Sequence, residues 1–267
     1  MQMIFCPLYS GSSGNATLVG YGDTRVLVDC GKSGLAIEEA LKFIGEDPRN
    51  LNAIVVTHEH HDHVAGIGVM ARRYHIPIYA SHETWAAMPQ GIGKITEGLQ
   101  REFTVGEDFY IGQMGIDSFS VSHDAADPCG FRLWGGTSSV SVVTDIGYAP
   151  FRVKEAIEGS DLILLESNYD PEMLHANEHY RYALKKRIES RSGHLSNSEC
   201  ADVLSELVQS GTSHFILGHL SGENNTPELA MQTTATRLEL EGLRLDEDVH
   251  VSMAWRDRVG DIFSVGR

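Results

Sequence analysis

The first thirty residues alternate short apolar runs with clusters of turn-forming residues. The runs IFCPLY, NATLVG and TRVLVD are separated by SGSSG and YGD. Because β-branched and aromatic residues favour strands while Gly, Ser and Asp favour turns, this pattern predicts antiparallel strands. The period then changes. Ile37, Leu41 and Ile44 follow Ser33 with the spacing of one helix face, which predicts an amphipathic helix over 33–45.

Similar patterns continue along the chain. The run AIVV predicts a buried strand, residues 64–74 a helix, and residues 77–145 a second, mostly β meander. The elements predicted beyond it are helices at 150–158, 178–190, 196–209 and from Thr226, and strands at 161–166 and over HFILG. Two β-rich regions, each followed by helices, predict two sheets packed face to face between outer helices. We therefore expect a single α/β domain over 1–267, a four-layer αββα sandwich.

Composition and charge restrict the partners. The 267 residues are 42% hydrophobic and 22% charged, which is typical of a globular protein. The net charge of −16 repels polyanions, so a nucleic acid or other phosphodiester must be held locally, and a membrane partner is not expected. Four scattered cysteines form no CxxC motif, and the N-terminus carries no pattern of a signal peptide. These features favour the cytoplasm.

The chemistry is expected around THEHHDH, where His58, His60, Asp62 and His63 follow a predicted strand. Imidazoles and carboxylates at this spacing indicate a site for divalent metal ions. Four local ligands are too few for two ions. Three more candidates, each directly after an apolar strand-like run, are His123, Asp145 and His219. Their shared position predicts that they meet the first motif at one sheet edge.

These motifs resemble the metallo-β-lactamase fold superfamily, in which LVDCG, THEHHDH, SHDA, TDIG and LGHLS occur in the same order. The segments SGSSGNATLV, SGHLSN and GHLSGENN are similar to the YycJ-like (WalJ-like) subgroup, regarded as phosphodiesterase or DNA exonuclease-like. The resemblance implies an αββα sandwich with two metal ions. One ion would be held by His58, His60 and His123, the other by Asp62, His63 and His219, with Asp145 bridging. Zinc is the first expectation, and manganese and iron are the alternatives.

Two such ions can share a water, supply a bridging hydroxide and stabilise the charge of a phosphodiester under attack. Asp62 is therefore expected to be essential for catalysis. His194, in the segment RSGHLSN, is the candidate acid that protonates the leaving oxygen. Asp29 and Asn15 are expected to order the ligand loops rather than to bind metal.

The segment 180–191 is a basic exception in an acidic chain. Its basic residues, the candidate substrate contacts, are Arg181, Lys185, Lys186, Arg187 and Arg191. Tyr180 and Tyr182 lie between them and could stack on bases. The alternative is a solvated helix face on which Lys185 pairs with Glu189.

The predicted function is a binuclear metal-dependent phosphodiesterase or nuclease, with DNA or RNA and exo- or endonuclease action left open. The alternative is a small-molecule hydrolase of the same fold that cleaves a thioester, lactone or lactam. By family resemblance, a bridging Asp145 argues against a lactamase, and His60 in place of a glutamate argues against a diiron oxidoreductase. Intact ligand spacing disfavours a binding module without turnover.

Overall fold

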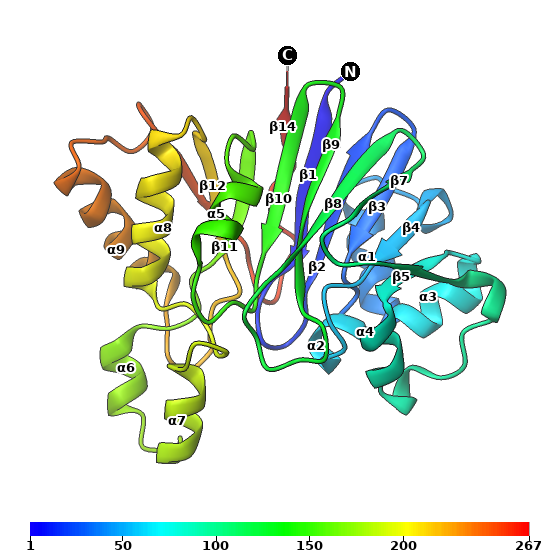
Figure 1. The fold of residues 1–267 in the computed structure, drawn as a ribbon, viewed down its shortest axis with the longest axis horizontal. Helices are drawn as coiled ribbons and strands as arrows, with labels where there is room; N and C mark the ends of the chain where they lie inside the picture. The colour runs from blue at the N-terminus through cyan, green and yellow to red at the C-terminus, as the bar shows by residue number, and fades with distance from the viewer. Residues whose placement is uncertain (267) are drawn as a thin grey trace.

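Two seven-stranded sheets lie face to face in the computed structural model, which describes residues 1–266 (Figure 1). In spatial order, the first sheet contains β14 (Phe263–Val265), β1 (Met3–Tyr9), β2 (Ala16–Tyr21), β3 (Thr24–Val28), β4 (Ala53–Val55), β5 (Ile78–Ser81) and β6 (Gln100–Phe103). The second contains β13 (His250–Met253), β12 (His214–Gly218), β11 (Leu162–Glu166), β10 (Ser138–Val143), β9 (Cys129–Gly135), β8 (Met114–Ser120) and β7 (Asp108–Ile111).

Helices cover the outer side of each sheet. The first sheet carries α1 (Gly34–Phe43), α2 (His61–Val64), α3 (Ile67–Tyr74) and α4 (His82–Ala87), and the second carries α5 (Phe151–Ile157), α8 (Asn197–Gln209) and α9 (Pro227–Leu240). The short helices α6 (Pro171–Ala176) and α7 (Tyr182–Ile188) project from the body at the lower left of Figure 1. Short 3₁₀ turns occur at Pro48–Asn50, Gln90–Ile92 and Glu97–Leu99. The predicted αββα sandwich is confirmed.

Strand alternation explains the layers, because successive side chains of a strand point to opposite faces. On β3, Val26 and Val28 pack in the core between the sheets, whereas Leu27 packs outward with α1 and α3. On β11, Leu164 faces the core between the sheets and Ile163 packs outward against the second helical layer. Both sheets are therefore apolar on both faces at their centres, and only their edges can carry a polar site.

One predicted region is divided differently. Residues 77–145 do not form one meander. β5 and β6 belong to the first sheet, where β5 pairs in parallel with β4, and β6 pairs in parallel with β5. Only β7 to β10 form the predicted antiparallel meander. Parallel neighbours require a crossover connection, and residues 82–99, which include α4, supply it between β5 and β6. An apolar run does not state which sheet it will join.

The helix predicted at 64–74 begins only at Ile67, as α3, and is separated by a break from α2, which ends at Val64. At the break, the amide of Gly66 donates to the carbonyl of Cys30 at 2.8 Å. A Cβ at Gly66 would lie 2.4 Å from the carbonyl oxygen of Lys32, so only glycine permits this approach. The interruption lets the histidine motif lie directly against the loop after β3.

Two predicted helix starts have different outcomes. The helix predicted from 178 begins only at Tyr182, because the Asn177 side chain accepts the amides of His179 and Tyr180 in a preceding turn. The helix α8 begins as predicted, with the reciprocal hydrogen bonds of a capping box between Ser196 and Glu199.

The C-terminal strands were not predicted. β13 pairs in parallel with β12, and β14 pairs antiparallel with β1 in the opposite sheet. Residues 254–262 therefore cross from one sheet to the other.

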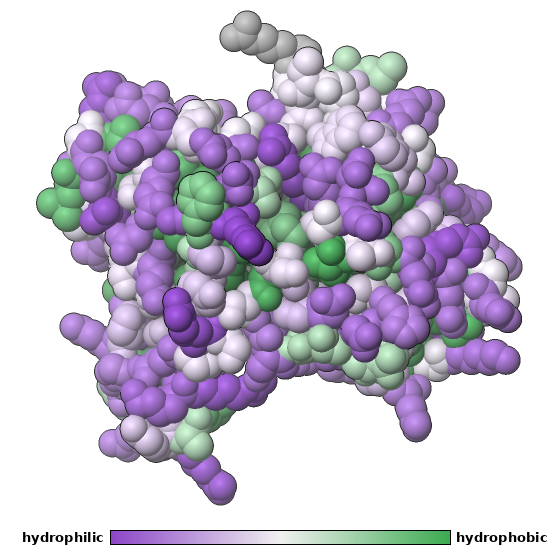
Figure 2. All heavy atoms as spheres, in the orientation of Figure 1, coloured by the Kyte–Doolittle hydropathy of each residue, from purple (hydrophilic) through white to green (hydrophobic). Residues whose placement is uncertain are grey.

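The surface in Figure 2 is mostly hydrophilic, with apolar residues scattered singly or in small groups. The projection formed by α6 and α7 is also largely hydrophilic. Within residues 1–266, no helix combines the length and apolar character needed to cross a membrane. The visible face thus offers mainly polar contacts to a ligand.

Candidate metal centre

The predicted ligands follow strands that end at one edge of the sandwich. β3 runs parallel to β4, and β10, β11 and β12 run parallel to one another. β8 and β10 are both antiparallel to β9, so they also point the same way. The histidine motif after β4 lies on the α2 side of this edge, at the bottom of Figure 1. Strand direction alone therefore gathers side chains that are distant in sequence.

Three of these strands end in an unusual backbone conformation. Asp29, Asp145 and His219 have φ values of 60°, 55° and 55°, in the left-handed region. Asp and His visit this region more readily than most residues, but each instance costs on the order of 1–3 kcal/mol. The same strained conformation recurs at the ends of three strands, which indicates that the surrounding structure holds these three side chains in fixed positions.

The first ligand cluster joins both sheets. The ring nitrogens of His58, His60 and His123 can be chosen so that all lie within 4.8 Å of one another. His60 Nδ1 and His123 Nε2 are 3.3 Å apart. Three imidazoles that converge in this way can hold one divalent ion.

A second cluster lies beside it, formed by Asp62, His63 and His219. His219 Nε2 and His63 Nε2 each lie 3.7 Å from Asp62 Oδ2. Asp145 is within reach of both clusters, because its Oδ1 lies 3.6 Å from His123 Nε2 and its Oδ2 lies 3.0 Å from His63 Nε2. The residues expected at the site are thus brought together, with Asp145 between the clusters.

Several atoms at this edge lack hydrogen-bond partners. Among residues 1–266, His58 Nε2, His219 Nε2 and Asp145 Oδ2 are buried without a well-directed hydrogen bond, although Asp145 Oδ2 lies within ion-pair distance of His63. Buried polar atoms are normally satisfied, and such orphans point to an ion or a ligand. The donor set of imidazoles and carboxylates therefore fits divalent cations.

The electrostatics agree with this interpretation. Burial, together with neighbouring His63, holds the pKa of His58 well below its usual value. Burial opposes ionisation of Asp145, but His219 and His63 outweigh it and hold the carboxyl pKa well below its usual range. Burial likewise opposes the charge of His219, whereas Asp145 and Asp62 raise its pKa to about 10. The edge therefore favours an ionised Asp145 carboxylate with positive charge around it, and bound metal cations can supply that positive charge.

Asp29 and Asn15 lie where the sequence places supporting residues. Asp29 Oδ2 accepts from His63 Nδ1 at 2.8 Å, and Asp29 Oδ1 accepts from the amide of Thr57 at 2.8 Å. Asn15 Nδ2 lies 3.0 Å from His63 Nε2. The carboxylate of Asp29 thus fixes the ring of His63 and leaves Nε2 directed at the site.

Glu166 is a site residue that the sequence interpretation left without a role. Its buried Oε1 accepts from His219 Nδ1 and from His194 Nδ1, each at 2.8 Å, while Oε2 accepts from the amide of Ile146 at 2.7 Å. The signal was present, because Glu166 ends the apolar run DLILLE just as Asp145 ends its own. One carboxylate therefore orients both a candidate ligand and the candidate acid.

His194 lies beside both clusters. Its ring centre is 5.2 Å from that of His123 and 5.4 Å from that of His219. Its side chain is 21% exposed, in contrast to the fully buried His63. His194 is thus partly accessible, as His60 is, and one of its nitrogens is held by Glu166.

The basic segment is less uniform than expected. The predicted pair of Lys185 with Glu189 does not form, because the Lys185 ammonium donates to the carbonyl of His175 and Lys186 pairs with Glu189 instead. Arg187 pairs with Asp124, next to His123. Arg191 stacks on Tyr148 at 4.2 Å, and the exposed Arg181 precedes the first turn of α7. The segment therefore approaches the site, but much of its charge is already engaged.

Comparison with known proteins identifies the family. A β-lactamase superfamily domain model matches residues 24–220. The chain is 38% identical to exodeoxyribonuclease YycJ of Bacillus anthracis over 92% of this chain and 93% of that protein. It is 39% identical to exodeoxyribonuclease WalJ of Streptococcus pneumoniae over 91% of each chain.

A solved structure shares the fold. The metallo-β-lactamase fold protein YhfI from Bacillus subtilis has a TM-score of 0.76 at 18% identity, covering 99% of this chain and 100% of that chain. Together with the sequence matches and the clustered ligands, this confirms the family inferred from the motifs. The chain belongs to the metallo-β-lactamase superfamily of hydrolases, in the group that contains YycJ and WalJ.

Proposed function

We propose that this chain is a binuclear metal-dependent phosphodiesterase that degrades DNA as an exonuclease. The observation that carries the proposal is the position of Asp145 between two clusters of ligands. Relatives named exodeoxyribonucleases, at 38% and 39% identity over more than nine-tenths of this chain, support the choice of DNA.

The proposed ligand sets are His58, His60 and His123 for one ion, and Asp62, His63 and His219 for the other, with Asp145 shared. Two divalent ions supply Lewis acidity, which lowers the pKa of a water and neutralises charge on the phosphoryl group. Zinc is our first choice, with manganese and iron as alternatives, since this donor set accepts all three. Asp62 is therefore required for catalysis through the second cluster.

His194 is the proposed general acid. Glu166 holds its Nδ1, which fixes the ring and leaves Nε2 as the nitrogen able to carry a proton to the substrate. As the phosphorus–oxygen bond breaks, this proton passes to the departing sugar oxygen. Its partial exposure beside both clusters supports this role.

The proposed substrate contacts on α7 and its flanks are Arg181, Lys185, Lys186, Arg187 and Arg191. Because Arg187 and Lys186 already have acidic partners, we expect each to contribute less than a free cation would. We place the activity in one domain spanning 1–267. We also place the protein in the cytoplasm, because its four cysteines are all buried and free, as is usual in a reducing compartment.

The direct test is hydrolysis by the purified protein supplied with Mn²⁺ or Zn²⁺. We expect turnover of bis-p-nitrophenyl phosphate and progressive shortening of end-labelled DNA, and loss of both in Asp62→Ala. Circular dichroism and metal analysis of Asp62→Ala separate loss of the ions from loss of the fold.

Each other outcome assigns a different activity. Cleavage of RNA in preference to DNA would change the substrate, and internal products would replace exonuclease with endonuclease action. Turnover of a thioester or lactone without phosphodiester cleavage would establish the small-molecule alternative and overturn the proposal.

A further inference from the structure

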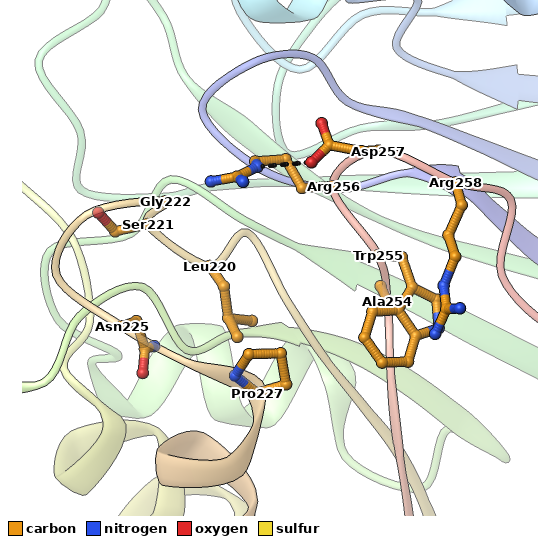
Figure 3. Close-up of a pocket in the computed structure, with 10 residues that line it drawn as sticks. All are labelled: Leu220, Ser221, Gly222, Asn225, Pro227, Ala254, Trp255, Arg256, Asp257 and Arg258. Atoms are coloured by element: carbon orange, nitrogen blue, oxygen red, sulfur yellow. Dashed lines mark hydrogen bonds and ion pairs between the residues drawn. The ribbon is translucent and has the colours of Figure 1, made fainter.

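A hollow of about 380 Å³ opens beside the metal centre, within the range of small-ligand sites (Figure 3). It is lined by the loop after β12 and by the crossing segment after β13. Its floor is apolar, with Leu220, Pro227 and Ala254, and charged side chains lie around its mouth. The ligand that fits should therefore have an apolar face and a charged group.

Trp255 forms one wall. The Arg258 guanidinium lies 3.7 Å from the centre of its ring, while Figure 3 shows Leu220 and Pro227 across the hollow. Trp255 is half-buried and Arg258 is exposed. A ring backed by a cation and open toward a hollow is suited to stack on a planar group.

Arg256 provides the charge at the mouth. A Cβ at Gly222 would lie 1.7 Å from its Nη1, and one at Gly11 would lie 3.0 Å from its Cγ. The side chain thus lies closely against the loops that carry Gly11 and Gly222. The side chain remains 40% exposed and its Nε pairs with Asp257 at 3.2 Å. Two arginines against one aspartate line the hollow, in a chain of net charge −16.

A short path of hydrogen bonds connects the hollow to the metal centre. Ser10 donates its amide to the carbonyl of Trp255 at 2.9 Å, and its hydroxyl accepts the amide of His219 at 2.8 Å. Leu220, on the floor of the hollow, follows His219 directly. The backbone that lines the hollow therefore lies next to the backbone of His219, a proposed metal ligand.

We infer that this hollow is a nucleotide subsite, in which a base of single-stranded DNA stacks on Trp255 while Arg256 binds the adjoining phosphate. The inference rests on the proposed function, since it names a binding site for the same substrate. Combined stacking and charge is the mode by which proteins bind single strands without reading their sequence.

The test measures binding without turnover. Fluorescence anisotropy of labelled phosphorothioate oligothymidylate, whose linkages resist hydrolysis, compares the metal-loaded parent protein with Trp255→Leu, Trp255→Phe and Arg256→Gln. We expect Trp255→Leu to weaken binding roughly 5- to 150-fold, the range for loss of one stacked base. Trp255→Phe should lose less, because it retains a ring. Arg244→Gln, which changes another arginine paired with acidic neighbours, should bind like the parent.

An abasic strand makes the test specific for stacking. The parent should bind it more weakly than oligothymidylate, and Trp255→Leu should not distinguish the two. Equal affinities of the parent for both strands, or unchanged binding in Trp255→Leu and Arg256→Gln, would overturn the inference. If Trp255→Leu does not fold, Trp255→Phe and Arg256→Gln decide. Hydrolysis of bis-p-nitrophenyl phosphate by the parent tests the metal centre separately, so the two proposals fail independently.

Discussion

The ligand edge and the basic helix α7 are neighbours built in opposite ways. At the ligand edge, Asp145 and His219 are 4% and 1% exposed, and each lies just after a strand of the second sheet. On α7, Lys186 and Arg187 are 55% and 58% exposed, and no residue of the helix is buried. One region has fixed positions and unsatisfied atoms, and the other has movable side chains whose charges have partners.

The difference shows where chemistry and affinity should be sought. Preorganised polar groups in a buried site act strongly because they need no rearrangement and little water screens them. Exposed charges act through a screened field, and each contributes little. We therefore expect substitutions at the edge to stop turnover, and substitutions on α7 to change only how DNA is held.

The largest effect should come from Asp145→Asn. The shared carboxylate serves both clusters, so its loss should reduce the bound metal and lower turnover of bis-p-nitrophenyl phosphate by more than the roughly 10- to 100-fold typical of a supporting residue. Metal analysis and steady-state kinetics measure this. Asp161→Asn is the control. Asp161 precedes β11, which is parallel to β10, so it lies at the opposite end of these strands from Asp145 and outside both clusters. If Asp145→Asn retains its activity and its bound metal, the ligand edge would not differ from α7 in its importance for turnover.

His194→Ala should affect substrates unequally. A general acid contributes about 100-fold or more when the leaving group is basic, as in DNA, and much less for nitrophenolate, which departs without a proton. Rates for labelled DNA and for bis-p-nitrophenyl phosphate, each relative to the parent, give the comparison. Equal losses with both substrates would assign His194 to positioning alone.

Glu166→Gln should have a smaller effect, near the low end of the roughly 10- to 100-fold range for residues that orient ligands. Glutamine preserves the shape but loses the charge that holds His219 and His194. Chelator competition measures metal affinity. The control is Glu199→Ala, which removes the acceptor of the capping box at Ser196 and should lower the melting temperature without changing metal affinity. A reduced melting temperature with unchanged metal binding would make Glu166 merely structural.

The sequence was most informative where one local rule suffices. The motif around His58 is contiguous, and His123, Asp145 and His219 share the pattern of an apolar strand followed by a polar residue. Glu166 has the same pattern, but nothing local shows that its carboxylate turns toward two histidines.

Information that depends on tertiary contacts was not available from the sequence. The apolar runs of β5 and β6 do not reveal which sheet they join. Glu189 has basic residues at both i−4 and i−3, and only the direction of the side chains selects Lys186. Trp255 is not part of any sequence motif, because the hollow beside it is formed only when the loop after β12 folds against residues 254–258.

The smallest effect is expected from α7. In the variant Arg181→Gln, Lys185→Gln, Lys186→Gln, the plot of log affinity for single-stranded DNA against log salt should become less steep. Each lost phosphate contact contributes about 0.7 to the slope. Because Lys186 already pairs with Glu189, the total change should be smaller than three free contacts would give.

The control is Lys42→Gln with Arg49→Gln, which removes two basic charges from α1 and the following turn, away from the ligand edge. It should weaken binding at low salt through net charge alone and leave the slope close to that of the parent. If the α7 variant behaves in the same way, the helix is a solvated surface. The strand would then be held by the metal centre and the hollow at Trp255, and the contrast would be between a catalytic edge and a projection without a role in binding DNA.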